Sequence, residues 1–338
     1  MKRIALLACC GTLLGSLSLA NAGPQEPADA LVYDAMAAPA TVSYTGVVQT
    51  VRIGDDGSEA SVYRIEHRAP NQTVRKYSSP PALSGDYVVT RGVETYSVDV
   101  IRRRVVKARN DAVNDQIAVD NNYLLLRQNY RALRRSEESL DGRNVVDVAL
   151  VNNYTHKTTV LVRIDSITKV VLDKQQFSAD GSLLSETRFE QVSYNATPPA
   201  TDFAVPQAYP VAAGSDFNAS SDDPHATASA AGFAVREPKF LPEGFSPVQA
   251  RVEPLHGVRT LHVLYSDGLR TVSLFENNAG AAVDLTRLHP QTATVAGRDA
   301  DYAQSGPTML LAWRDAGLHY ALVGELNLDE LEKIAASI

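Results

Sequence analysis

The pattern of apolar and polar positions changes twice within the first hundred residues. Residues 31–38 form helix readily, and Pro39 ends the predicted helix. Residues 41–53 and 58–67 then alternate with a period of two, which is typical of half-buried strands. The Gly-Asp-Asp-Gly run at residues 54–57 predicts a hairpin between them. Similar runs at residues 73–77, 87–90, 93–98 and 101–108 extend this pattern, so we expect an antiparallel meander.

A helical pattern interrupts the alternation at residues 117–133, where Asn121 or Asn122 is a suitable N-cap. Strand-like runs return at residues 144–151, 158–164, 170–177 and 183–194. Asp-Gly pairs at residues 141–142 and 180–181 mark turns between them. Because strands twist, a long meander curls. We therefore expect a curved antiparallel half-barrel with covering helices over residues 23–195.

The following segment, residues 196–232, is rich in Pro, Ala, Ser and Asp and is interpreted as a linker between domains. Residues 233–338 predict a smaller α+β domain with several further strands. Its last element is a helix, for which Asn327 is the expected N-cap and Glu330 completes a capping box. The predicted fold class is therefore mainly β (α+β): a half-barrel followed by a smaller α+β domain.

The N-terminus has the order of features of a secretory signal. Lys2 and Arg3 precede an uncharged apolar run through residue 20, and Ala20-Asn21-Ala22 follows. We expect export, with residues 1–22 removed by cleavage near Ala22. A retained anchor is the alternative, although nothing basic follows the run as a stop signal. Leu-Leu-Ala-Cys at residues 6–9 leaves lipid modification of Cys9 open as a question.

Composition narrows the classes of partner. The chain has 338 residues, enough for two domains, and a formal net charge of -7, which argues against nucleic acid as the main partner. Both cysteines lie inside the predicted signal. The mature chain would therefore hold no disulfide, no thiolate metal ligand and no cysteine nucleophile.

The motifs of catalysis are missing from the sequence. It contains no glycine-rich phosphate loop, no Gly-x-Ser-x-Gly elbow and no histidine pair at helical metal spacing. The nearest histidines, His256 and His262, have no acidic cluster beside them. We expect a binding protein without catalytic residues, cofactor or metal. A hydrolase of envelope polymers is the weaker alternative.

Two features suggest binding surfaces. Tyr123, Leu124, Leu126 and Tyr130 form an apolar cluster in the predicted helix. This cluster could line the mouth of the half-barrel and contact an acyl chain, or it could pack on the sheet as core.

Arginines supply the second feature. They occur at residues 102–104 and at Arg131, Arg134 and Arg135. These groups could contact acidic lipid headgroups or the carboxylates of a partner, or they could be the solvated charges of harmless edge strands.

Several stretches resemble the MucB/RseB family of periplasmic regulators of envelope-stress sigma factors. The clearest are Phe-Leu-Pro-Glu-Gly-Phe at residues 240–245 and Leu-Tyr-Ser-Asp-Gly-Leu at residues 264–269. Val-Gly-Glu-Leu at residues 323–326, before the last helix, is similar to the family's closing motif. Asp-Gly-Arg at residues 141–143 and Val-Arg-Ile-Asp at residues 162–165 extend the resemblance into the first domain. The same layout occurs in lipoprotein carriers of the LolA type.

The resemblance implies a specific function. The protein would be a periplasmic negative regulator that binds the periplasmic segment of a single-span anti-sigma factor and senses lipid or lipopolysaccharide in a LolA-like half-barrel. The MucB/RseB-like second domain would grip the anti-sigma factor, with Leu241, Phe245, Tyr265 and Leu269 as candidate contacts. The alternative is a carrier of lipid or lipoprotein that has no such partner. The sequence does not identify the oligomeric state.

Overall fold

The computed structural model describes residues 26–54, 57–110, 116–140, 142–195, 197–217, 227, 231–255, 257–279, 285, 288–305 and 308–338. The predicted signal segment and Cys9 lie outside these residues. Within them, no helix combines the length and apolar character needed to cross a membrane.

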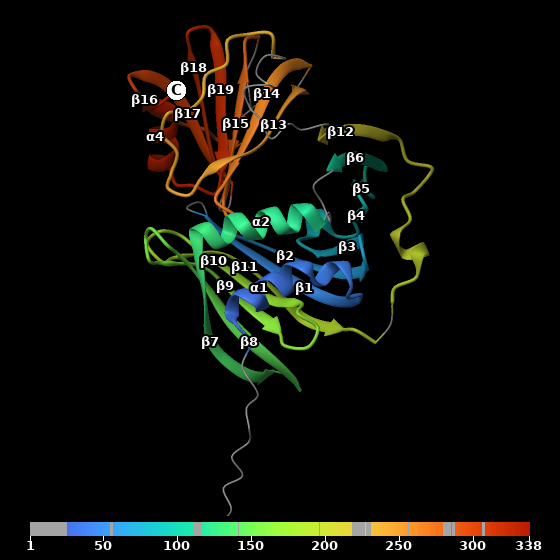
Figure 1. Ribbon diagram of the computed structural model, residues 1–338. Coiled ribbons are helices and arrows are strands. Elements are labelled where there is room, and N and C mark those ends of the chain that lie inside the picture. The colour runs from blue at the N-terminus through green and yellow to red at the C-terminus, as the bar shows by residue number, and fades with distance from the viewer. Residues whose placement is uncertain are drawn as a thin grey trace, which may run out of the picture.

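A twelve-stranded sheet forms the larger part of the molecule (Figure 1). Its strands are β1 (Tyr44–Gly54), β2 (Gly57–Arg68), β3 (Gln72–Ser79), β4 (Tyr87–Arg91), β5 (Glu94–Asp99), β6 (Arg104–Asn110), β7 (Tyr130–Leu140), β8 (Arg143–Asn152), β9 (Thr158–Asp165), β10 (Val171–Phe177), β11 (Leu183–Ser193) and β12 (Val211–Phe217). Their spatial order is β12-β6-β5-β4-β3-β2-β1-β11-β10-β9-β8-β7. Two meanders, β1 to β6 and β7 to β11, thus join where β1 pairs antiparallel with β11.

The sheet is curved (Figure 1). Its ladders shift register between Val47 and Val48, between Val171 and Asp173, and between Arg134 and Ser136. Such bulges bend a strand and increase its twist. The predicted antiparallel half-barrel follows from these irregularities together with the ordinary twist of strands.

Two helices cover one face of the sheet beside β7, β8 and β9 (Figure 1). They are α1 (Ala28–Ala37), extended by the 3-10 turn η1 (Ala38–Ala40), and α2 (Gln116–Asn129). Leu31 and Val32 of α1 and Leu126 of α2 pack with Val148 and Ile164 in one buried cluster. The helices therefore cover the apolar surface that the strands leave on this face.

A segment after β11 covers the opposite face near β3, β4 and β5. It contains the 3-10 turn η3 (Ala200–Phe203), whose Phe203 is 1% exposed and packs with Val74 and Val89. The chain then adds β12, which pairs parallel with β6 at the sheet edge. Part of the predicted linker is thus built into the first sheet. A further 3-10 turn, η2 (Pro81–Leu83), connects β3 to β4.

A second, seven-stranded sheet sits beyond α2 (Figure 1). Its spatial order is β13-β14-β15-β19-β18-β17-β16. The bounds are β13 (Ser246–Leu255), β14 (Val258–Ser266), β15 (Thr271–Asn277), β16 (Gln291–Val295), β17 (Arg298–Ser305), β18 (Thr308–Asp315), β19 (Leu318–Gly324) and the helix α4 (Leu328–Ala336).

The expected capping box is present at α4. The Asn327 side chain accepts a hydrogen bond from the Glu330 backbone at 2.8 Å, and the Glu330 carboxylate accepts one from the Asn327 backbone at 3.1 Å. Leu331, Ile334 and Ala335 then pack on the sheet. The predicted fold class is confirmed: a mainly β chain with a curved antiparallel sheet, covering helices and a smaller α+β unit.

Candidate functional site

The turn between β14 and β15 packs against the C-terminal end of α2 and so connects the second sheet to the first unit. Asp267 shapes this turn, because its Oδ1 accepts hydrogen bonds from the backbone N–H groups of Leu269 at 2.9 Å and Arg270 at 2.7 Å. Gly268 has φ +97, and a Cβ there would lie 2.6 Å from the backbone nitrogen of Leu126. Glycine is therefore required both for the backbone conformation and for the close approach of the helix.

Asn129, the last residue of α2, contacts two loops of the second unit: the segment before β13 that contains Gly244, and the β14–β15 turn. Its Nδ2 lies 3.0 Å from the carbonyl oxygens of Gly244 and Asp267, and Tyr154 donates to its Oδ1 at 3.1 Å. The side chain is 3% exposed. A buried amide with partners on both sides makes separation of the sheets costly, because each partner would lose a hydrogen bond.

Tyr130 adds a second buried contact next to Asn129. Its hydroxyl donates to Asp267 Oδ2 at 2.7 Å, and Arg270 Nε donates to the same oxygen at 2.9 Å. Burial, and next the charge of Asp267, raise the pKa of Tyr130, so it remains a neutral donor. The Arg270 guanidinium also lies 5.2 Å from the Phe245 ring centroid. We call the set Asn129, Tyr130, Asp267 and Arg270 the latch.

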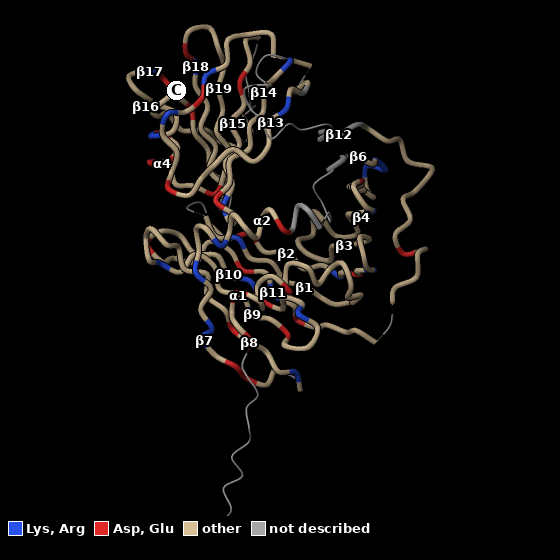
Figure 2. Tube along the Cα trace, in the orientation of Figure 1, with Lys and Arg blue, Asp and Glu red and all other residues tan. Residues whose placement is uncertain are grey.

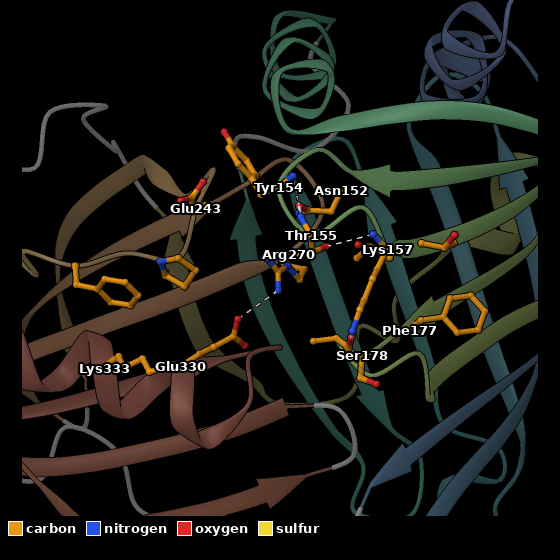
Figure 3. A pocket seen from close by; sticks show the side chains of 15 residues that line it. Asn152, Tyr154, Thr155, Lys157, Phe177, Ser178, Glu243, Arg270, Glu330 and Lys333 are labelled. Carbon is orange, nitrogen blue, oxygen red and sulfur yellow. Dashed lines mark hydrogen bonds and ion pairs between the residues drawn. The ribbon is translucent and has the colours of Figure 1, made fainter.

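A cleft of about 470 Å³ opens beside the latch, between the two units (Figure 3). Residues of both units line it: Asn152, Tyr154, Thr155, Lys157, Thr158, Thr159, Phe177, Ser178 and Ala179 from the first, and Phe240, Pro242, Glu243, Arg270, Glu330 and Lys333 from the second. A neighbouring cavity of about 210 Å³ shares Thr159, Phe177, Ser178, Ala179, Arg270 and Glu330 with it.

The cleft carries charges of both signs. Figure 3 shows Glu330 and Lys333 of α4 opposite Phe177 of β10 and Lys157 of the β8–β9 turn. Arg270 lies 3.8 Å from Glu330, and Gln176 donates to Glu325 at 3.2 Å where the units meet. No group of three or more metal-binding side chains occurs among the described residues. The arrangement suits recognition of a chain with apolar and charged side chains.

The four residues predicted for a lipid cavity have different surroundings. Leu126 and Tyr130 are buried in the cluster beneath the helices, and Tyr123 donates its hydroxyl to the Asp29 carbonyl at 2.9 Å. Leu124 is 56% exposed. Leu126 and Tyr130 therefore pack as core in this conformation, and lipid contact by these four side chains stays a prediction.

The four residues predicted for partner binding lie mostly inside the molecule. Tyr265 is 3% exposed and Phe245 is also buried, both in the second sheet's core, and Leu241 packs against that core. Leu269 instead packs against the core of the first sheet. Leu269 is thus a contact between units, and its role toward a partner stays a prediction.

Sequence reasoning missed the latch. The Asp-Gly pair at residues 267–268 is typical of a turn, and apolar Leu269 just after it is a sign that the turn would be covered. Nothing in the local sequence marks Asn129 as its counterpart, because the two residues are 138 positions apart.

Residues 235–338 match a family model described as a domain of unknown function, DUF4367. No curated protein matches the chain. A crystal structure of MucB with the periplasmic part of MucA is similar over 92% of this chain and 98% of that one, with 19% identity and a TM-score of 0.62. The chain has the MucB fold.

Two more MucB structures agree with this assignment. The Pseudomonas aeruginosa MucA/MucB complex covers 92% of this chain and 97% of its own, with 19% identity and a TM-score of 0.62. MucB alone matches 92% of this chain and 96% of its own, with 16% identity and a TM-score of 0.53. The resemblance first seen in scattered motifs is therefore confirmed as a fold that includes both sheets.

Proposed function

We propose that the protein is a periplasmic regulator that binds the periplasmic segment of a membrane-anchored, single-span anti-sigma factor and thereby restrains an envelope-stress sigma factor. The observation that carries this proposal is the match of both sheets, in one arrangement, to MucB bound to MucA. A carrier would need only the half-barrel. A match that spans 92% of the chain favours a function that uses both units.

The cleft is the binding site that we propose for the anti-sigma segment. Its volume of about 470 Å³ lies within the ordinary range of ligand sites. Phe177 and Phe240 offer apolar surface. Lys157 and Lys333 can pair with carboxylates of a partner, and Glu330 can pair with a basic side chain. Because each unit supplies one wall, the affinity depends on the relative position of the two sheets, which the latch holds.

Lipid would act by changing the relative position of the two sheets. An acyl chain in the hollow of the half-barrel would displace α2 from the first sheet, and α2 carries Asn129 of the latch. A ligand that binds better to the open arrangement shifts the population toward it and so releases the partner. The site that we propose for the lipid lies under α1 and α2, where Leu126 and Tyr130 now pack.

The test uses the mature chain and the purified periplasmic segment of the anti-sigma factor from the same genome. Phe240→Asp and Phe177→Asp should each weaken binding by about tenfold to a hundredfold, because aromatic side chains commonly dominate an interface. Ile167→Asp, at an exposed position outside the cleft lining, is the matched control. Unchanged affinity in both cleft variants would refute the cleft as the site.

The carrier alternative has its own signature. Mass spectrometry of solvent extracts would detect acyl chains that co-purify with the protein. Acyl chains together with no measurable affinity for any anti-sigma segment would support a carrier and contradict the regulator. If lipid is present and its addition releases a bound segment, both parts of the proposal stand.

A further inference from the structure

The hairpin between β5 and β6 ends in an exposed apolar tip followed by three arginines. Ile101 is 75% exposed, and Val100 beside it is also exposed. Arg102, Arg103 and Arg104 come next and are all exposed. Figure 2 shows basic residues at this outer end of β6, away from the seven-stranded sheet. Ile101 therefore lies largely in solvent at the end of the hairpin, and Val100 partly so.

A neighbouring loop extends this surface. The Asp86 carboxylate accepts a hydrogen bond from the Val100 backbone at 2.8 Å, and the Asp86 backbone donates to the Leu83 carbonyl at 2.9 Å. Leu83 is another exposed apolar side chain. Asp86 thus ties the β3–β4 loop to the hairpin and keeps three apolar side chains at one end of the sheet. We call Leu83, Val100, Ile101 and Arg102–Arg104 the tip surface.

The charges at the tip favour an anionic partner. Asp99 holds Arg102 at 2.8 Å, and the Arg103 guanidinium lies 5.6 Å from the Tyr209 ring centroid. This end of the sheet thus carries three guanidinium groups and two carboxylates, Asp86 and Asp99, and both carboxylates already accept backbone hydrogen bonds. The chain as a whole carries a formal net charge of -7, so this local excess of positive charge is opposite to the overall balance.

The second arginine group of the sequence has a different environment. On β7, Arg134 lies 2.6 Å from Glu137, and Glu138 lies 3.0 Å from Arg163. Carboxylates are interleaved with the guanidinium groups there, and the exposed apolar side chain at the strand end is Leu140. The β7 group therefore fits a solvated edge strand, whereas the tip surface does not.

We propose that the tip surface docks the protein on an anionic phospholipid bilayer. Val100 and Ile101 enter the headgroup region, and the arginines contact lipid phosphates while their stems lie along the interface. A convex hairpin tip buries too little area to hold a folded protein by itself. A soft bilayer interface can surround the tip on all sides. Weak docking of this kind would keep the protein close to any membrane-anchored partner.

The test is vesicle flotation with the mature chain and no other protein. Vesicles that contain phosphatidylglycerol should carry the protein at low salt and lose it at high salt, because salt screens exposed charges. Vesicles of pure phosphatidylcholine should carry much less. Absence of binding to the anionic vesicles at low salt would overturn the proposal.

Variants locate the contact. Arg103→Gln with Arg104→Gln should reduce partitioning by roughly tenfold or more, and Ile101→Ser by about tenfold. The matched controls are Arg131→Gln with Arg135→Gln for charge, and Ile167→Ser for exposed apolar surface. Equal losses in the controls would show general adsorption and refute a specific tip. Tip variants that keep vesicle binding but lose capture of an acidic protein would likewise refute it.

Fluorescence gives an independent readout of insertion. The natural Trp313 is buried, so an Ile101→Trp variant adds a tryptophan whose emission reports the tip. Its emission should shift to shorter wavelength with anionic vesicles. An unshifted spectrum during flotation would contradict insertion. Because these assays contain no anti-sigma segment, their outcome is independent of the proposed regulatory function.

Discussion

The two sheets bury their apolar residues in different ways. In the seven-stranded sheet, one cluster of nineteen buried hydrophobic residues joins the strands to α4, and a second cluster of three contains Leu285. In the twelve-stranded sheet, the largest such cluster among the described residues has ten, and smaller ones lie on both faces. The smaller unit therefore has most of its core in one large cluster, while the larger one divides its core among several clusters, which α1, α2 and η3 cover. Because a divided core can lose one covering element and keep the rest, we expect the larger unit to be the more adaptable one.

The largest effect is expected when the contact of η3 with the larger sheet is weakened. Phe203→Ala should destabilise the first unit by about 3–5 kcal/mol, because a fully buried aromatic ring leaves a cavity under η3. Urea unfolding followed by circular dichroism would measure it. Val205→Ala, on the same segment but only partly buried, is the control and should cost less. Equal small effects would mean that η3 contributes little to this unit.

The stability of the unit with the seven-stranded sheet should depend on pH through Glu276. Burial raises the pKa of Glu276 to about 7, from an ordinary value of 4.5. Its Oε2 accepts a hydrogen bond from the Arg236 backbone at 3.2 Å, and Oε1 has no partner among the described residues. Below pH 4.5 the group is protonated in both folded and unfolded chains. Between pH 4.5 and 7 the folded chain binds more protons, so stability falls as pH rises.

The expected loss from Glu276 is about 3 kcal/mol, from 1.36 kcal/mol per pKa unit. Glu276→Gln should flatten this part of the stability profile of the second unit. Glu332→Gln on α4 is a control whose carboxylate is in a less buried place. A profile that keeps its slope in Glu276→Gln would assign the pH dependence to another group.

A change in the latch between the units should have a smaller effect on stability. Asn129→Ala leaves buried partners unsatisfied and should cost about 1–3 kcal/mol. The loss should appear as weaker coupling, so that the two units unfold in separate transitions in calorimetry. Asn153→Ala is the control, since Asn153 Nδ2 donates to the Gln128 carbonyl in an exposed position. A single unchanged transition in Asn129→Ala would argue against the latch.

The smallest effect is expected at Leu124. Its side chain is on the solvent side of α2, so Leu124→Ser should change stability by less than about 0.5 kcal/mol. The same change should weaken acyl-chain binding if Leu124 contacts lipid when α2 moves. Binding assays with a fluorescent fatty acid would measure it. Unaltered lipid affinity would remove Leu124 from the list of candidate contacts.

The fold was predictable where its signals are local. Alternating positions, Asp-Gly turns and the Asn327 capping box specify elements through neighbours in the chain, and these predictions were right. The strand β7 was missed, because residues 131–138 carry charges typical of a solvated helix or loop and only their edge position explains them. The strand β12 was hidden in an Ala- and Gly-rich stretch read as linker.

The candidate site was less accessible to such reasoning. The cleft forms because Phe177 of the first unit and Phe240 of the second lie on its two walls. The latch forms because Asn129 contacts two loops that are distant in the sequence. Hydrophobic periodicity assigns a residue to a face of its own element. It does not tell which other element will cover that face.

The fit of Gly268 against α2 has a consequence for comparing relatives of this protein. Any larger residue at position 268 would meet helix backbone and would also be strained. An alignment would therefore show glycine here even in homologues that had exchanged one binding partner for another. Invariance at this turn would report how the molecule is assembled, and recognition should be sought at positions free to vary.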